Sequence, residues 1–383
     1  MKVHQFHIPS ASLDVPQEQP AAAGGAPVNL LLVFGSVEDL EAPGLGAALR
    51  AAYPQARLAG CSTAGQISAQ GVTDGSIAVT AISFEHPAFR VVTTELGGAD
   101  QSHGAGAELA RQLAGPGLHD VVVFAQGVAI NGSALIDGIA SILGPEVKIS
   151  GGLAGDGGAF RRTVVLSDAG VSDRRILGIG FYGSHMRISH GSFGGWQPFG
   201  PVRRVTRSAG NVLYELDNQP ALELYKRYLG DYARDLPSSG LLFPFSMLGA
   251  DHGTVGLIRT ILGVSESDGS LTLAGDIIPD GYLRLMHASP DALIDGAQAA
   301  AELARDAVEC MGDSLALLVS CVGRRLVMGD RIDEEVEAVA EVFGARNVMA
   351  GFYSNGEISP FLAGPECRLH NQTMTISRWR ESA

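Results

Sequence analysis

Two glycine-framed turns carry the residues of this sequence that could do chemistry. They read GCSTAGQ at residues 60–66 and GFYSNGE at residues 351–357. Glycine lets backbone N–H groups face a ligand without an intervening Cβ, and such a concave array suits a carboxylate or another anion. We therefore expect a small polar metabolite at these turns. The candidate ligand-binding residues are Gly60, Cys61, Ser62, Thr63, Gly65, Gln66, Ser354, Asn355, Gly356 and Glu357.

Glycines at such positions also make ordinary tight turns between strands, so a purely structural role is the alternative. Cys61 could act as a nucleophile or redox thiol, but activation needs a base or a positive charge, and none adjoins it in the sequence. A small buried residue is the favoured interpretation. Glu357 could serve as a general base, yet a binding or capping role is favoured because no fixed partner is visible. We expect no catalytic residues and no enzymatic turnover; an enzyme that uses Cys61 or Glu357 is the competing class.

Histidines are the other candidates, in the segment GSHMRISHGSFGGWQPFG at residues 183–200. His185 and His190 are five residues apart, so on a strand they face opposite sides and cannot chelate one ion together. His190 lies near Phe193 and Trp196, and a lone imidazole with aromatic neighbours can hold a haem iron. A satisfied structural histidine is the alternative. His185, His252 and His287 compete for any ligand role.

The sequence lacks the common motifs of several enzyme and ligand-binding classes. The chain has no GxxxxGK[ST], HExxH or GxSxG motif, no GxGxxG that opens a helix, and no calcium-binding loop. Its four cysteines are not spaced as zinc ligands or as a disulfide framework; they are Cys61, Cys310, Cys321 and Cys367.

Composition limits the partners. The net charge of −14 argues against nucleic acid and anionic membranes, and basic residues cluster only as pairs that read as solvated edges (Arg161-Arg162, Arg203-Arg204 and Arg324-Arg325). The first residues, MKVHQFHIPSAS, do not resemble a signal peptide, and no apolar run reaches the roughly 20 residues of a membrane span. We expect a cytoplasmic protein without membrane insertion.

The elements that position these residues are repeated along the chain. An apolar run, a helical stretch and a glycine turn occupy residues 28–67 and again 314–358, with a looser copy at 120–156. A second module, two strand patterns followed by a helical one, occupies residues 74–113 and is matched to 268–306. The repeats predict an α/β (mixed α+β) fold, with two domains of mixed sheets and flanking helices built from duplicated βαβ and ββα modules.

We expect the following division of the chain: a flexible lead-in at 1–27, a sensory domain at 28–200, a crossover and connecting helix at 201–235, a second domain at 236–365, and a terminal strand and tail at 366–383.

Several segments, in the correct order, resemble one family. They are GCSTAGQI, DGSIAVTAISF, GWQPFGPVRRVTRSAGNVLYELDNQPALELYKRYLG, GFYSNGEISP and HNQT. Over about residues 28–365 the chain resembles the FIST (F-box and intracellular signal transduction) family, which has paired FIST N and FIST C domains. The resemblance implies a sensor of bacterial signalling that binds small ligands such as amino acids.

No F-box or output domain is visible, so the resemblance further implies action on a separate partner, such as a histidine kinase or a cyclic-dinucleotide enzyme. One branch of the family, similar in size and architecture, is described as haem-binding nitric oxide sensors that regulate a partner kinase. That branch implies haem as an alternative ligand, with His190 as the candidate metal ligand.

Overall fold

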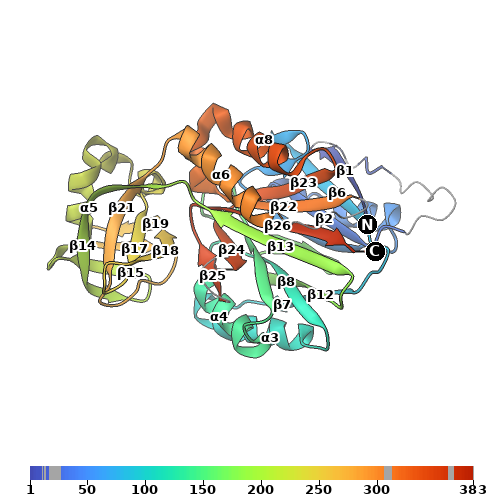
Figure 1. The fold of residues 1–383 in the computed structure, drawn as a ribbon, viewed down its shortest axis with the longest axis horizontal. Coiled ribbons are helices and arrows are strands. Elements are labelled where there is room, and N and C mark those ends of the chain that lie inside the picture. The colour runs from blue at the N-terminus through green and yellow to red at the C-terminus, as the bar shows by residue number, and fades with distance from the viewer. Residues whose placement is uncertain (11, 13, 17–26, 306–312, 361–365, 383) are drawn as a thin grey trace.

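The computed structural model describes residues 1–10, 12, 14–16, 27–305, 313–360 and 366–382. Three six-stranded sheets form its larger part, and the first of them contains strands from the first half of the chain (Figure 1). Its order is β1 (Lys2–Pro9), β6 (Ser76–Ser83), β2 (Leu30–Gly35), β3 (Arg57–Ser62), β10 (Val165–Ser167) and β11 (Gly170–Ser172). Only the central pair β2–β3 is parallel.

The other two sheets repeat this arrangement. The second has the order β7 (Phe89–Glu95), β12 (Arg175–Tyr182), β8 (Leu118–Ala125), β9 (Lys148–Leu153), β24 (Gly356–Pro360) and β25 (Cys367–His370). The third has the order β13 (Met186–Phe193), β26 (Met374–Glu381), β22 (Ser314–Cys321), β23 (Asn347–Ser354), β4 (Gln66–Ser68) and β5 (Gly71–Thr73). Again only the central pairs, β8–β9 and β22–β23, are parallel.

The sheets are joined by a cyclic exchange of hairpins. The hairpin β4–β5 follows β3 in the chain but pairs with β23. The hairpin β10–β11 follows β9 but pairs with β3, and β24–β25 follows β23 but pairs with β9. Each sheet is therefore completed by a hairpin from another repeat.

Helices make the crossovers between the parallel strands, as parallel pairs require. They are α1 (Val37–Leu40) and α2 (Leu45–Ala52) before β3, α4 (Gly132–Leu143) before β9, and α7 (Val322–Met328) and α8 (Ile332–Phe343) before β23. Two further helices precede β8 and β22, namely α3 (Ser102–Leu113) and α6 (Pro290–Ala304). Local sequence fixes their starts: the side chains of Asn131 and Ser289 accept hydrogen bonds from the third residue of α4 and α6, respectively. Short 3-10 turns adjoin α3 and α8 at η1 (Ala99–Gln101) and η4 (Gly329–Arg331).

The three sheets face one common apolar core. Phe34 of β2, Phe124 of β8 and Phe352 of β23 meet there, with ring centroids 4.9 to 5.9 Å apart. Alternate residues of β2, such as Leu31 and Val33, face the opposite way and pack under α1 and α2. Strands buried on both faces need near-continuous apolar runs, which the sequence supplies at VNLLLVF and SLALLVSC.

Residues 197–287 form a separate lobe, inserted between β13 and α6 (Figure 1). Its sheet has the order β18 (Thr254–Arg259), β17 (Phe245–Leu248), β21 (Tyr282–His287), β14 (Gln197–Ala209), β15 (Val212–Leu216), β20 (Ser270–Leu273) and β19 (Ile261–Ser265), with β16 (Gln219–Pro220) beside β15. The helix α5 (Ala221–Leu229) shares its apolar core, and η2 (Gly230–Asp235) and η3 (Ser238–Leu241) follow.

The predicted α/β class with mixed sheets is confirmed, and the βαβ module occurs at all three predicted places. The match of residues 268–306 to 74–113 is wrong in its strands. By topology, β12 and β13 correspond to β6 and β7, whereas β20 and β21 belong to the lobe. The Asp-Gly-Ser signature that suggested the match is a turn signal common to many strands. Only the helix, α6, corresponds as expected to α3.

The flexible lead-in expected at residues 1–27 needs correction, because Lys2–Pro9 pairs along its whole length with β6. Residues 17–26 of that segment, and 361–365 of the second expected domain, lie outside the described residues. The other domain limits stay predictions; the sheets themselves draw strands from both expected domains. No helix in the described part of the chain is both long and apolar enough to cross a membrane.

Candidate functional site

The two turns singled out in the sequence lie side by side, and a third joins them. The Ala64 amide donates to the Tyr353 carbonyl at 2.8 Å, and the Tyr353 amide donates to the Gly65 carbonyl at 2.9 Å. The Gly155 amide donates to the Ser62 carbonyl at 2.8 Å. The ends of β3, β9 and β23 therefore meet at one junction, which we call the turn junction (residues 62–66, 153–156 and 353–357).

Three glycines permit this junction. A Cβ on Gly60, Gly151 or Gly351 would lie 1.8, 2.1 or 1.9 Å from a carbonyl oxygen of the neighbouring parallel strand. These glycines occupy equivalent positions in the three sheets. Gly60 thus has a packing role, because its backbone is pressed against β2, and its predicted contact with a ligand stays a prediction.

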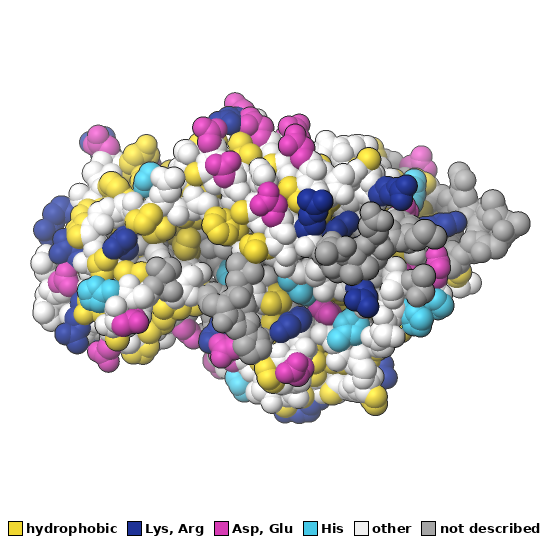
Figure 2. All heavy atoms as spheres, in the orientation of Figure 1, with side chains coloured by type: hydrophobic (Ala, Val, Ile, Leu, Met, Phe, Trp, Pro, Cys, Tyr) yellow, Lys and Arg dark blue, Asp and Glu magenta, His cyan; other side chains and the backbone are white. Residues whose placement is uncertain are grey.

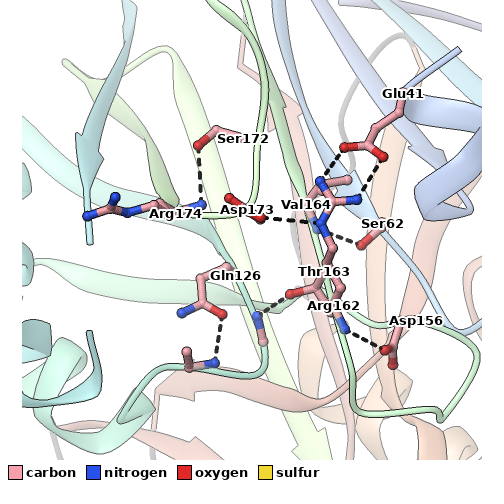
Figure 3. A network of polar contacts seen from close by, with 12 residues as sticks. Glu41, Ser62, Gln126, Asp156, Arg162, Thr163, Val164, Ser172, Asp173 and Arg174 are labelled. Carbon is pink, nitrogen blue, oxygen red and sulfur yellow. Dashed lines mark hydrogen bonds and ion pairs between the residues drawn. The ribbon is translucent and has the colours of Figure 1, made fainter. Parts of the chain in front are cut away.

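Cys61 and Ser62 are enclosed and do not line the cavity beside the turns. Cys61 has no exposed surface and lies in the common core, where burial raises the pKa of its thiol well above the ordinary value. A protonated, enclosed thiol cannot attack a substrate. Ser62 donates to the Gly155 carbonyl at 2.8 Å and accepts from the Val164 amide at 2.9 Å, and Figure 3 shows the second of these bonds. Its hydroxyl therefore ties β3 to the loop that follows β9.

The residues of the other turn hold the junction together. Ser354 Oγ donates to Glu357 Oε1 at 2.7 Å, and the amide and hydroxyl of Thr373 donate to Oε2 at 3.1 and 3.0 Å. Burial raises the pKa of Glu357 to about 8, although these hydrogen bonds lower it. Asn355 donates to the Gly127 carbonyl at 3.2 Å. Gly356 begins β24 opposite Leu153. Glu357 is therefore held by hydrogen bonds at both carboxyl oxygens, in a site closed to solvent, and the binding or capping role expected for it stays a prediction.

Three of the predicted ligand residues line an open cavity. Thr63, Gly65 and Gln66 form one wall of a cavity of about 410 Å³, which we call the turn cavity. Its other polar walls come from Ser36, Glu38, Asp74, Asp156, Arg161 and Arg162. Gln66 is only 2% exposed, and its carboxamide oxygen has no hydrogen-bond partner among the described residues. Buried polar atoms in proteins are nearly always paired, so an orphaned acceptor in a cavity wall indicates a missing partner.

The loop after β9 shapes the opposite wall. Asp156 accepts hydrogen bonds from the backbone amides of Phe160, Arg161 and Arg162 at 2.7 to 3.0 Å. Figure 3 shows the bond from Arg162. The guanidinium of Arg162 is paired with Glu41 and, at 3.2 Å, with Asp173. Arg161 is exposed and forms no ion pair with a described residue. In the sequence, Asp156 stands out only as the last residue of the looser repeat at residues 120–156, and the pair Arg161-Arg162 is expected to be a solvated edge.

The surroundings of His190 do not fit a haem. Its Nε2 atom lies 2.7 Å from Asp120 Oδ1, and the other carboxylate oxygen is 2.7 Å from His119 Nδ1. Its Nε2 atom thus already has a partner, and its Nδ1 atom is buried without a hydrogen-bond partner among the described residues. His190 lines neither the turn cavity nor the larger cavity described below. His185 stacks on His86, with centroids 4.1 Å apart. Among the described residues, no group of three or more His, Cys, Asp or Glu side chains is arranged to hold a metal ion.

Comparison with known families decides the identity. Residues 29–219 match the model of the FIST N domain, and residues 221–360 match that of the FIST C domain. The chain belongs to the FIST family. FIST domains are associated with signal-transduction sensing, which confirms the predicted sensory class at this coarse level.

One curated relative of this FIST protein is an uncharacterized protein of Methanocaldococcus jannaschii, 31% identical over 99 residues. The match covers 25% of this chain and only 19% of the relative, so the chain spans about a fifth of that protein's length. Two solved structures align over nearly the whole of both chains. Cyanuric acid hydrolase from A. caulinodans covers 100% of this chain and 99% of its own, at 11% identity and a TM-score of 0.36. A chorismatase covers 98% of both chains, at 10% identity and a TM-score of 0.31.

Both of these structures are enzymes, and this overturns the expectation that the FIST chain belongs to a non-catalytic class. Neither reaction is carried over, since identity and TM-score are low. The two residues named for an enzymatic alternative, Cys61 and Glu357, are both enclosed and line neither cavity.

Proposed function

We propose that this FIST protein is a sensor that binds a small polar ligand in the turn cavity and regulates a separate signalling protein. The observation that carries the proposal is at Gln66, a residue of the cavity wall whose carboxamide oxygen is buried without a hydrogen-bond partner among the described residues. A ligand with an N–H or O–H group would satisfy this oxygen and recover the free energy that an unpaired buried acceptor costs.

The remaining walls suggest the ligand's other groups. The exposed Arg161 can pair with a carboxylate, while Glu38 and Asp74 can face an ammonium group. The walls therefore favour a small zwitterionic metabolite, in keeping with the sequence-based expectation of an amino acid.

The cavity is connected to the junction of all three sheets. Arg325 of α7 donates to the Ala64 carbonyl and to Asp74, at 3.0 Å for one carboxylate oxygen. The same guanidinium lies over the aromatic ring of Tyr353 in a cation–π contact, which links it to β23. A ligand that contacts Asp74 or Gly65 would compete with the contacts of Arg325. It could thereby shift the surface that α7 and α8 present to a partner.

The partner is proposed to be a signalling protein such as a histidine kinase, in the cytoplasm. Acidic side chains gather over α6 and α8, at the top of Figure 2, in keeping with the net charge of −14. Such a surface suits a partner with basic side chains better than it suits nucleic acid.

The test is a thermal-shift screen of the purified protein against polar metabolites, including the common amino acids. At least one compound is expected to raise Tm, and Gln66→Leu is expected to abolish the shift. Gln70→Leu is the matched control, since Gln70 is an exposed residue at the tip of the same hairpin. A shift that survives Gln66→Leu would place the ligand elsewhere and overturn this site.

A further inference from the structure

A second cavity lies between the lobe and the sheets, and we call it the lobe cleft. Its volume is about 440 Å³. The lobe contributes Val255, Leu257, Arg259 and Ile277, and the first turns of α4 and the strand β25 contribute Ser133, Ile136 and Leu369. We propose that the lobe cleft binds a small monocarboxylate with an apolar body, with Arg259 as its counter-ion.

Arg259 is a buried cation without a carboxylate partner. Arg259 is only 4% exposed. It donates to the carbonyl oxygens of Asp276, Ile258 and Leu369 at 3.1 to 3.2 Å, and it forms no ion pair with a described residue. Carbonyl oxygens satisfy N–H groups but carry no full negative charge, and the carboxylate of Asp276 stabilises the guanidinium only from beyond ion-pair distance. A buried charge that is compensated only in part is costly, and a carboxylate in direct contact would lower that cost.

Burial lowers the pKa of Arg259 to about 10, so the guanidinium remains charged at neutral pH. The backbone at Gly275 also leaves room for the guanidinium of Arg259. A Cβ on Gly275 would lie 2.9 Å from Arg259 Nε and 3.0 Å from its central carbon. The glycine therefore allows the guanidinium to lie against the strand connection and face the cleft.

A second polar group in the cleft lacks a partner. Ser133 Oγ, in the first turn of α4, is buried and has no hydrogen bond with any described residue. It lies on the wall of the cleft that α4 forms and close to the lobe, because a Cβ on the lobe residue Gly275 would be 3.3 Å from it. A carboxylate between the two would accept hydrogen bonds from both Ser133 and Arg259.

The lining also limits the kind of anion. Leu257, Ile277 and Leu369 offer an apolar surface for a hydrocarbon body. Asp137, Asp276 and Glu366 are exposed at the edge of the cleft, where Arg368 pairs with Glu366. The three carboxylates outnumber the two arginines of the lining, Arg259 and Arg368, so they would repel a phosphate or a dicarboxylate more strongly than a monoanion, and a single carboxylate on an apolar chain fits best.

Such a ligand would contact the lobe and the sheets at the same time. This site is independent of the turn cavity, since the two share no lining residue. Binding here would favour one placement of the lobe relative to α4 and β25, which goes beyond the proposed function of the turn cavity.

The experiment uses hexanoate as the probe and hexanamide as its uncharged counterpart, each titrated into the full chain by calorimetry. Hexanoate is expected to bind at least about tenfold more tightly than hexanamide, since it alone pairs with a charged donor. Arg259→Met is expected to weaken hexanoate binding by about tenfold or more and to leave hexanamide unchanged. Arg207→Met removes a charge from the same lobe outside the cleft and is expected to have no effect.

Ser133→Met keeps the test decisive if Arg259→Met fails to fold, because it fills the cleft without disturbing the hydrogen bonds of Arg259. It is expected to abolish hexanoate binding, whereas Gln66→Leu should leave that binding intact. The proposal is overturned if hexanoate and hexanamide bind equally, or if hexanoate binding survives Ser133→Met. Since Gln66→Leu tests the turn cavity alone, failure at one site is distinguishable from failure at the other.

Discussion

The backbone amide of Ala64 donates a 2.8 Å hydrogen bond to the carbonyl oxygen of Tyr353, joining the turn after β3 to the turn after β23. The two strands belong to different sheets, so this bond ties together repeats from opposite ends of the chain. The turns can meet because each strand that leads into the junction packs closely on its parallel neighbour.

Alanine at any of the three packing glycines should therefore destabilise the whole protein. Gly60→Ala, Gly151→Ala and Gly351→Ala each place a Cβ within 1.8 to 2.1 Å of a carbonyl oxygen. We expect each to lower the free energy of unfolding by about 2–3 kcal/mol, as overpacking does. Gly151→Ala should cause the largest loss of stability, because the φ of 119° at this position is also strained for alanine. Urea denaturation measures the change.

Gly104→Ala is the control for this series. Gly104 lies within α3, and a Cβ there would meet nothing within 4 Å. The substitution should stabilise the protein by about 0.5–1 kcal/mol, because alanine is the better helix former. Equal effects at Gly104 and at the three packing glycines would refute the close approach of the strands.

The repeats could be predicted because each βαβ crossover leaves its own pattern of apolar run, helix and glycine turn. The exchange of hairpins could not. Gln66 pairs with Phe352, and nothing near Gln66 in the sequence specifies a strand so far along the chain. The match of residues 268–306 to 74–113 was wrong for a related reason. The lobe is inserted between β13 and α6, so two elements of one repeat are far apart in the sequence.

The candidate site was predicted in part. The turns do meet, but only Thr63, Gly65 and Gln66 of the ten candidates face a cavity. Which way a side chain points in a short turn depends on the neighbouring strands, and these come from other repeats. Arg259 lies in an apolar run without a motif, so only its burial beside a cavity distinguishes it.

Breaking the buried ion pair of Arg324 and Glu335 should destabilise the protein more than breaking a similar pair on the surface. Their ion pair is 2.7 Å long with both side chains unexposed, and the hydroxyls of Ser320 and Tyr353 also donate to Glu335. Glu335→Gln leaves the Arg324 charge buried and uncompensated, which should cost about 3–5 kcal/mol of stability. Chemical denaturation of the variant measures the loss.

Glu334 provides the matched control on the same helix. It pairs with Arg331, but both side chains are more than 40% exposed. Solvent screens such a pair, so Glu334→Gln should leave the stability unchanged within error. A similar loss for the two variants would contradict the assignment of the buried pair.

Cys61 should behave as a core residue and not as a reactive thiol. Cys61, Cys321 and Cys367 are all buried, and burial raises the pKa of each thiol. In a Cys310→Ser background, which removes the cysteine outside the described residues, a thiol reagent should modify the folded protein only as fast as it unfolds. Cys61→Ala should cost about 1 kcal/mol by leaving a small cavity, without altering ligand binding. Rapid labelling of the native protein that disappears in Cys61→Ala would show an accessible thiol instead.

Glu357 should make the protein less stable as the pH rises. Its pKa is about 8 in the folded protein against an ordinary value of 4.5. Between these values the folded state binds the proton and the unfolded state does not, so unfolding releases it. The stabilising contribution is complete below about pH 4.5 and is lost as the pH rises through about 8, by up to about 1.4 kcal/mol per pH unit for one proton. Urea denaturation in steps from pH 6.5 to 8.5 measures the slope.

Glu357→Gln should flatten that slope, because an amide keeps the contacts to Ser354 and Thr373 and has no proton to lose. The chosen range separates this effect from that of His370. Burial lowers the pKa of His370 to about 4, so its folded state binds the proton less tightly than the unfolded state does. His370 therefore makes stability rise with pH, but only up to about its ordinary value of 6.5. If wild type and Glu357→Gln lose stability in parallel above pH 6.5, the titrating group is not Glu357, and the buried carboxyl does not hold its proton as its surroundings require.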